Sequence, residues 1–207
     1  MEQKITTLFL DIGGVLLTSG WDRNSRQLAA TSFNLDWEEM EDRHHLTFGL
    51  YEAGMLSMDE YLNRIIFHQK RSFSKEDFKA FMFEQSSPIE GSIEFFRSLK
   101  SMHSLKVIAV NNEARELNDY RIKKYNLDLL FDAFVSSCYV YRSKPDLEIW
   151  RMACGIAQVL PRNILYIDDR LLFVEVAKSM GIHSYHFQRL EDAKLFVQAI
   201  NFSYVNV

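Results

Sequence analysis

Thr7-Leu8-Phe9-Leu10-Asp11-Ile12-Gly13-Gly14-Val15-Leu16-Leu17 is the stretch that decides the fold. Its β-rich apolar run, residues 7–10, ends abruptly at Asp11, two glycines follow, and apolar residues then resume. The run predicts a strand buried on both faces, with Asp11 at its carboxyl end, where open parallel sheets bind ligands. Gly13 and Gly14 let the backbone turn tightly and approach a ligand closely. Taken alone, the stretch is equally typical of a strand that ends in an ordinary turn.

Strands and helices alternate in the second half of the chain. Further apolar strands are predicted over residues 105–110, 133–135, 163–167 and 182–187. Helical spacing falls between them, from about residue 93 and over 116–125, 147–157, 172–180 and 190–200. This alternation predicts an α/β fold with a doubly wound parallel sheet and right-handed crossovers.

Residues 18–87 follow a different pattern, with helical spacing and no strand signal. Asp36 is a predicted N-cap, and Ser57 to Glu60 and Ser74 to Asp77 each form a capping-box sequence. The segment therefore predicts about four helices between the first strand and the rest of the sheet. We expect a core domain of residues 1–17 and 88–207 and a helical cap domain of residues 18–87.

Composition excludes several classes of protein. The 207 residues are 47% hydrophobic and 25% charged, which is typical of a soluble globular protein. A net charge of −4 argues against nucleic-acid binding, and no apolar run reaches transmembrane length or forms a secretory signal. The only cysteines, Cys138 and Cys154, have no metal or redox spacing. We expect a cytoplasmic protein with reduced thiols and no membrane or nucleic-acid partner; the sequence leaves its oligomeric state open.

Acidic and polar residues follow three of the predicted strands. Asp11 ends the first, Asn111 the second, and Asp168 and Asp169 the fourth, while Lys144 lies in the loop after the third. In a parallel sheet these ends share one edge, so the side chains would converge in one crevice. Gathered carboxylates repel each other, and Mg²⁺ together with the lysine would neutralise them. The set suits phosphoryl chemistry with Asp11 as nucleophile.

With these motifs in this order, the chain resembles the haloacid dehalogenase superfamily, in its phosphatase-like branch with a helical cap inserted after the first strand. The first motif matches residues 11–15, the lysine motif Lys144-Pro145, and the acidic motif Asp168-Asp169. Residues 48–57 also resemble the family's linker between cap helices. The resemblance covers nearly the whole chain, up to about Phe187.

The resemblance implies an aspartyl-phosphate mechanism on a small phosphorylated metabolite that the cap selects. Asp11 would attack phosphorus, water would later hydrolyse the intermediate, and Lys144 would stabilise nucleophile and phosphate. Mg²⁺ would be held by Asp11, the Gly13 carbonyl and Asp168, with Asp169 binding it directly or supporting the ligands. The implied phosphate-binding residues are Gly13, Gly14, Asn111 and Asn112.

Three motif positions depart from the family pattern. Gly13 replaces the aspartate that usually serves as general acid and base, and Asn111 replaces a Ser or Thr. Leu172 and Phe173 replace a polar residue that usually follows the acidic pair. These departures favour, as an alternative, a catalytically degenerate member that binds a phosphorylated ligand or a protein partner. A third choice is a 2-haloacid dehalogenase, which needs no metal and lacks such an acidic pair.

Other candidates carry less weight. His44 and His45 lie on a predicted cap helix, and helical geometry lets at most one of them face the crevice. Trp21 and Asp22 either line the cap entrance or belong to a plain linker. Arg170 beside the acidic pair is interpreted as a solvated arginine rather than an anion ligand. A two-component receiver domain is excluded because its acidic pair ends the first strand, not the fourth.

Overall fold

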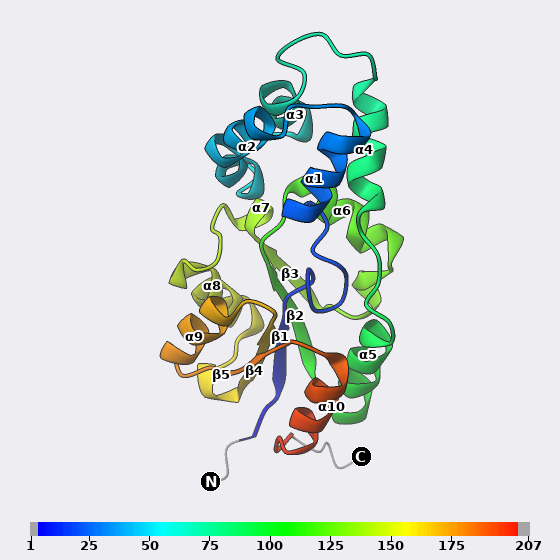
Figure 1. The fold of residues 1–207 in the computed structure, drawn as a ribbon. Helices are drawn as coiled ribbons and strands as arrows, with labels where there is room; N and C mark the ends of the chain where they lie inside the picture. The colour runs from blue at the N-terminus through cyan, green and yellow to red at the C-terminus, as the bar shows by residue number, and fades with distance from the viewer. Residues whose placement is uncertain (1–3, 203–207) are drawn as a thin grey trace.

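The computed structural model describes residues 4–202 and contains one five-stranded parallel sheet in the order β3-β2-β1-β4-β5 (Figure 1). Its strands are β1 (Thr7–Leu10), β2 (Lys106–Asn111), β3 (Ala133–Ser136), β4 (Ile164–Asp168) and β5 (His183–His186). The central strand β1 pairs with both β2 and β4, so Leu10 lies between Ala109 and Ile167. All carboxyl ends of the strands therefore meet at one edge.

Ten α-helices and two short 3₁₀ turns complete the described residues. In the first half they are α1 (Arg23–Ser32), α2 (Trp37–Glu52), α3 (Met58–Ile65), α4 (Lys75–Glu84) and α5 (Ser92–His103). In the second half they are α6 (Arg115–Lys124), η1 (Leu127–Leu129), α7 (Ser137–Val140), α8 (Leu147–Ala157), η2 (Pro161–Asn163), α9 (Leu171–Ser179) and α10 (Leu190–Gln198).

Both faces of the sheet are buried, as the continuous apolar strands require. Leu8 and Leu10 point to a cluster that includes residues of α5 and α10, whereas Phe9 points to a cluster with α8 and α9. Figure 1 shows these helix pairs on opposite sides of the strands. This packing holds the carboxyl edge of the sheet rigid, which is what a site built on that edge needs.

Helices α1–α4, which we call the cap helices, stand beyond the carboxyl edge of the sheet (Figure 1). They share a hydrophobic cluster of their own, with Tyr51, Tyr61 and Phe78 fully buried in it. Ala114 and Leu117, at the start of α6, also belong to this cluster and join the cap helices to the sheet region. The chain passes between the sheet region and the cap helices twice, near residues 17–18 and near residues 87–88, and we call these two segments the chain crossings. The predicted domain boundaries fall at these crossings and stay a prediction.

The two chain crossings lie side by side. Thr18 N donates to Ser87 O at 2.8 Å, and Leu17 forms an antiparallel bridge with Pro88. The buried guanidinium of Arg121, from α6, donates to Ser86 Oγ at 2.9 Å and contacts Thr18 O at 3.4 Å. One α6 side chain thus fastens both crossings.

The predicted α/β fold is confirmed. Asp36 caps α2, and both capping boxes form, with Ser57 and Ser74 as N-caps of α3 and α4. The four-residue helix α7 was not expected. A four-residue helix is too short to show a period in the sequence. No helix among the described residues is both long and apolar enough to cross a membrane.

Candidate active site

The predicted carboxylates and lysine meet at the carboxyl edge of the sheet. Lys144 Nζ lies 3.2 Å from an oxygen of Asp11 and 2.6 Å from an oxygen of Asp168. One oxygen from each of Asp11, Asp168 and Asp169 lies within 4.8 Å of the others. Four residues from three separate parts of the chain thus form one cluster.

Backbone pairing fixes the two carboxylates nearest the sheet. The amide of Asp11 donates to Ile167 O at 3.0 Å, which continues the β1–β4 ladder by one residue. Asp168 ends β4, and its side chain accepts from Arg170 N at 2.7 Å and from the Tyr166 hydroxyl. Because Asp168 is fully buried, its carboxylate is held in one orientation.

Burial and mutual repulsion set the protonation of the cluster. Burial raises the pKa of Asp11 to about 7, opposed by the ammonium of Lys144 and assisted by Asp168. The pKa of Asp169 is raised by burial and by Asp168. Burial works to lower the pKa of Lys144, but the adjacent carboxylates of Asp11 and Asp168 outweigh it and keep the ammonium charged. One ammonium cannot neutralise three carboxylates, so the cluster favours a further cation.

Lys144 is positioned by the loop after β2. Asn112 Oδ1 accepts from Lys144 N at 2.8 Å, and Asn112 Nδ2 donates to Lys144 O at 2.9 Å. The ring of Phe173 lies 5.0 Å from the ammonium, in cation–π range. Phe173, which replaces the family's usual polar residue, is therefore a neighbour of the lysine.

The two glycines of the first motif serve different needs. Gly14 has φ +79°, and a Cβ there would lie 2.3 Å from the Asp169 carboxyl, so only glycine fits. A Cβ at Gly13 would meet only ordinary contacts, the nearest being Arg121 Nη1 at 3.6 Å. The absence of a side chain at residue 13 leaves space that opens toward this arginine.

Asn111 is not brought into the cavity. Its amide donates to Asn118 Oδ1 at 3.0 Å, and its carbonyl oxygen accepts from Ser136 Oγ at 2.7 Å. The amide nitrogen and the amide oxygen of Asn111 are thus both engaged in a buried hydrogen-bond network. Asn112, and not Asn111, lines the cavity.

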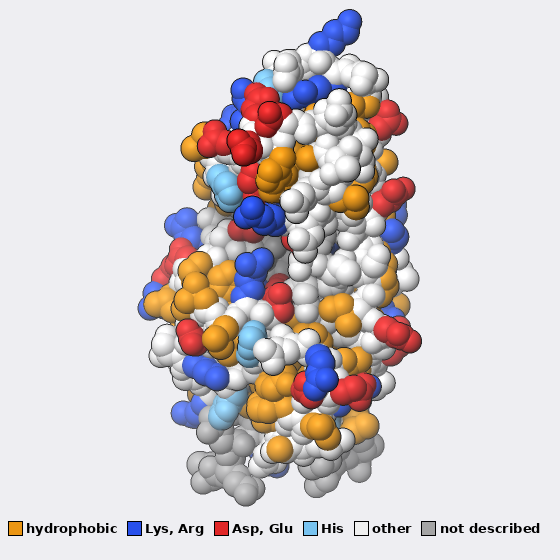
Figure 2. Space-filling model, viewed as in Figure 1, with side chains coloured by type: hydrophobic (Ala, Val, Ile, Leu, Met, Phe, Trp, Pro, Cys, Tyr) orange, Lys and Arg blue, Asp and Glu red, His pale blue; other side chains and the backbone are white. Residues whose placement is uncertain are grey.

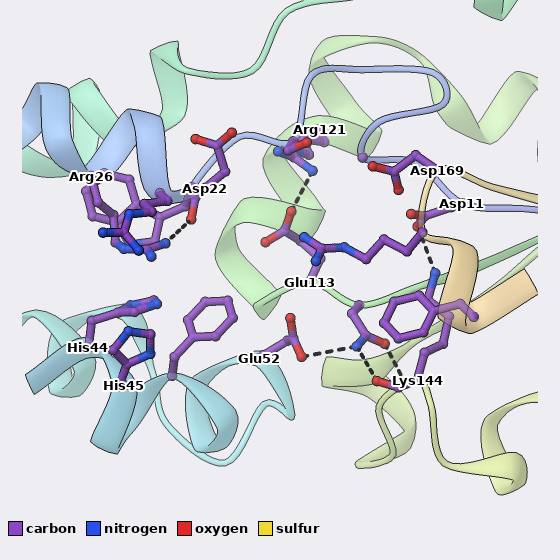
Figure 3. Close-up of a pocket in the computed structure, with 18 residues that line it drawn as sticks. Asp11, Asp22, Arg26, His44, His45, Glu52, Glu113, Arg121, Lys144 and Asp169 are labelled. Atoms are coloured by element: carbon purple, nitrogen blue, oxygen red, sulfur yellow. Dashed lines mark hydrogen bonds and ion pairs between the residues drawn. The ribbon is translucent and has the colours of Figure 1, made fainter. Parts of the chain in front are cut away.

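A cavity of about 460 Å³ lies between the sheet edge and the cap helices. Figure 2 shows the hollow at the waist of the molecule, with basic side chains above and below it. Besides Asp11, Lys144 and Asp169, its charged lining residues are Asp22, Arg23, Arg26, Glu52, Glu113, Arg121 and Arg170. The cavity is therefore polar and carries both signs of charge, as Figure 3 shows for the labelled residues.

On the side of the cap helices, aromatic residues and His44 beside the cavity are joined by hydrogen bonds. Tyr61 OH accepts from Trp21 Nε1 at 2.9 Å, which leaves its proton for Nδ1 of His44 at 2.7 Å. Burial lowers the pKa of His44 to about 3, so the imidazole is neutral and can accept that proton. The expectation that at most one of the two histidines faces the crevice was wrong, because the cavity opens to solvent beside α2 and also reaches the exposed His45.

Five charged cavity residues were not singled out in the sequence, namely Arg23, Arg26, Glu52, Glu113 and Arg121. Glu52 ends α2, Glu113 lies two residues beyond β2, and Arg121 is on α6. Arg121 Nη1 contacts Glu113 Oε2 at 2.5 Å, and both side chains are buried. Only burial identifies Glu113 and Arg121, since Glu and Arg side chains are usually solvated. Arg170 also lines the cavity, whereas Arg142 is half-exposed and lies near Asp146.

The cysteines take no part in the cavity lining. Burial raises the pKa of Cys138 to about 12, so its thiol stays protonated. Asp11, by contrast, lines the cavity.

Comparison with known proteins agrees with this geometry. The sequence model of the haloacid dehalogenase-like hydrolases matches residues 5–181. A phosphorylated carbohydrates phosphatase of Thermotoga maritima is 26% identical over 145 residues, covering 69% of this chain and 62% of that protein. Across the curated relatives it matches, the chain spans 35–62% of their length.

Solved structures show the same fold at lower identity. A haloacid dehalogenase family enzyme of Bacteroides thetaiotaomicron, solved in complex with magnesium and inorganic phosphate, has a TM-score of 0.77 at 21% identity. The match covers 93% of this chain and 99% of that one. A dehalogenase has a TM-score of 0.66 at 17% identity, covering 100% of this chain and 95% of that one. At these identities the likeness concerns the fold alone.

Proposed function

The chain belongs to the haloacid dehalogenase-like hydrolase family, and from that premise we propose that it is a Mg²⁺-dependent phosphatase of a small phosphorylated metabolite. The observation that carries the proposal is the buried cluster of Asp11, Asp168 and Asp169 around Lys144. Dehalogenation has no use for a cluster of three carboxylates, whereas such a cluster offers the oxygen ligands that a divalent cation prefers. The phosphatase among the relatives and the magnesium and phosphate complex among the similar structures support this choice.

The proposed roles follow from the chemistry of each group. Asp11 is the nucleophile, and its attack on phosphorus gives an aspartyl-phosphate that water later hydrolyses. Lys144 holds the Asp11 carboxylate in place and attracts the phosphate. The Asn112 side chain holds Lys144 by hydrogen bonds to the lysine backbone. Gly14, without a side chain, lets the loop after β1 pack closely against Asp169.

Asp11, Asp168, Asp169 and the Gly13 carbonyl would hold the metal. The carboxylate oxygens are the ligands that Mg²⁺ prefers, and their separation suits a shared ion. When bound, the metal would compensate the carboxylates and the charge that develops on the phosphoryl oxygens.

A catalytically degenerate binding protein is the alternative. It is favoured by Asn111, which is bound to Asn118 and Ser136 and cannot contact a phosphate in this arrangement, and by the missing side chain at Gly13. Loss of a general acid or base typically costs about 10²–10⁴ in rate. This alternative predicts binding of phosphate or metal without turnover.

The test is phosphate release from a panel of phosphorylated metabolites, with Mg²⁺ and with a chelator, for the parent and Asp11→Asn. We expect release that needs both the metal and Asp11. Efficient turnover of any metabolite would exclude the degenerate alternative. Equal activity of Asp11→Asn, or halide release from a haloacid without phosphate release from the panel, would contradict the proposal.

A further inference from the structure

The cavity contains a carboxyl group suited to the acid–base role that Gly13 cannot perform. Glu52, the last residue of α2, extends into the cavity from the cap side. Figure 3 shows it between His45 on α2 and Lys144. We propose that Glu52 is the general acid and base of the reaction, an inference that rests on the proposed phosphatase function.

The position of Glu52 fits the geometry of phosphoryl transfer. Attacking and leaving oxygens lie roughly in line through phosphorus. With Asp11 as nucleophile on the sheet edge, the leaving oxygen departs toward the cap helices. An acid for that oxygen must therefore come from the cap side, where Glu52 is.

The Glu52 carboxyl accepts a hydrogen bond at one oxygen and leaves the other oxygen free. Its Oε2 accepts from Asn112 Nδ2 at 3.1 Å, the same amide that contacts the backbone of Lys144. Its backbone carbonyl accepts from Ser137 Oγ at 2.7 Å, which anchors the end of α2 to α7. Oε1 has no hydrogen-bond partner among residues 4–202 and is available to a substrate.

Glu113 is the competing carboxyl in the cavity. Its Oε2 pairs with Arg121 at 2.5 Å, and its Oε1 accepts from Ala114 N at 3.2 Å. Both oxygens are thus engaged. Burial raises the pKa of Glu113, but the adjacent Arg121 guanidinium opposes this by favouring the ionised form. Glu52 has no such ion pair among the described residues, so it is the better proton donor.

The charges around Glu52 support a group that titrates near neutrality. Burial raises its pKa to about 7, and the carboxyl of Glu113 adds to this; Lys144, Arg170 and the Asn112 amide oppose it. General acid–base groups work best with a pKa near the working pH.

The proposed steps balance in protons and bonds. In the first, an Asp11 oxygen bonds to phosphorus, the bond from phosphorus to the leaving oxygen breaks, and the Glu52 carboxyl gives that oxygen its proton. In the second, Glu52 takes a proton from water, whose oxygen attacks phosphorus as the bond to Asp11 breaks. Inorganic phosphate is released, and both residues return to their starting forms.

The test is the dependence of kcat/KM on leaving group in Glu52→Gln, with p-nitrophenyl phosphate and phenyl phosphate as substrates. A poor leaving group needs protonation and a good one does not. We expect kcat/KM to fall about 10²-fold or more for phenyl phosphate and less than about 10-fold for p-nitrophenyl phosphate. Because the second step also loses its base, p-nitrophenol should appear in a burst followed by slow turnover.

Matched variants separate the possible outcomes. Glu38→Gln, on the exposed side of α2, should leave both substrates unchanged, and a retained melting temperature would show that Glu52→Gln is folded. An equal fall for both substrates, no fall, or the leaving-group effect in Glu113→Gln instead would overturn the proposal for Glu52. Loss of turnover with both substrates in Asp11→Asn would leave the phosphatase function standing in each case. A parent enzyme without turnover of any phosphoester would overturn both proposals.

Discussion

At the scale of single residues, Lys144 shows how closely charge balance controls this site. The residue is buried between Asp11 and Asp168 and is fixed through its backbone by Asn112. The sequence predicted that these groups would converge, because each follows a strand of one parallel sheet. It did not predict that Asn112 would hold the lysine, since that contact depends on how two loops meet.

Lys144→Met tests this charge balance. The methionine keeps the volume but leaves buried carboxylates without their counter-ion, which typically costs about 3–5 kcal/mol. We expect the free energy of unfolding in urea with a chelator to fall by about that amount, and added Mg²⁺ to restore part of it. Lys123→Met, at an exposed position of α6, should change stability by less than about 0.5 kcal/mol. Equal stability of Lys144→Met and the parent would show that the lysine does not neutralise the cluster.

His44 makes stability depend on pH in a defined direction. Burial lowers its pKa to about 3 in the folded protein, whereas a free histidine titrates near pH 6.5. Below pH 6.5 the unfolded chain therefore binds a proton that the folded protein does not, and stability falls as the pH drops toward 3.

His44→Gln should remove this contribution while keeping a polar partner for Tyr61. We expect the parent to lose up to about 1.4 kcal/mol per pH unit below pH 6, relative to the variant. Urea unfolding of both proteins at pH 7.5, 6 and 5 measures the difference. Parallel curves for the two proteins would show that His44 is protonated in the folded state.

At the scale of elements, the end of α2 connects the cap helices to the site. Glu52 is anchored to Ser137 of α7, and Gly54 follows with φ +72°. A Cβ at Gly54 would lie 2.4 Å from the carbonyl oxygen of Cys138, so this turn packs directly against α7. The sequence indicated that residues 48–57 resemble the family's linker between cap helices. It did not show that this segment packs on α7, because α7 itself was not predicted.

Gly54→Ala and Gly49→Ala are a matched pair for this contact. Gly54→Ala forces a side chain against backbone in a conformation that favours glycine, so we expect a loss of more than about 1 kcal/mol and lower activity through displacement of Glu52. Gly49 lies inside α2 with open space around it, and alanine there should stabilise the helix by about 0.5–1 kcal/mol. Thermal unfolding of both variants provides the comparison, and similar effects for the two would argue against tight packing on α7.

At the scale of the whole molecule, the cavity lies between the sheet and the cap helices, and each of these has a hydrophobic cluster of its own. One cluster lies between the sheet and α5 and α10, and the other lies within the cap helices. Their separate sequence patterns, alternating strands and helices against uninterrupted helical spacing, predicted the α/β fold and the helical segment. Which cap residues face the sheet could not be predicted, because that depends on how one packed group of helices is placed on another. Glu52, Glu113 and Arg121 were missed for this reason.

The chain crossings give the proposed domain division a physical basis. Residues 17–18 and 87–88 lie side by side, and Arg121 contacts both segments. The same guanidinium pairs with Glu113 in the cavity. Any movement of the cap helices relative to the sheet would therefore shift Arg121 and its partner Glu113 in the cavity. We expect the substrate to be selected in this shared space, which is polar and has a volume of about 460 Å³.

If Asp11 is the nucleophile, it is phosphorylated during turnover, and trapping that phosphorylated enzyme is the most direct test. The enzyme is mixed with p-nitrophenyl phosphate and Mg²⁺, quenched in acid within the first turnover, and mapped by peptide mass spectrometry. We expect a phosphoryl group on Asp11 in the parent, and none in Asp11→Asn or in the parent with chelator. Phosphate release without a phosphoryl group on Asp11, or its appearance on another residue, would contradict this expectation.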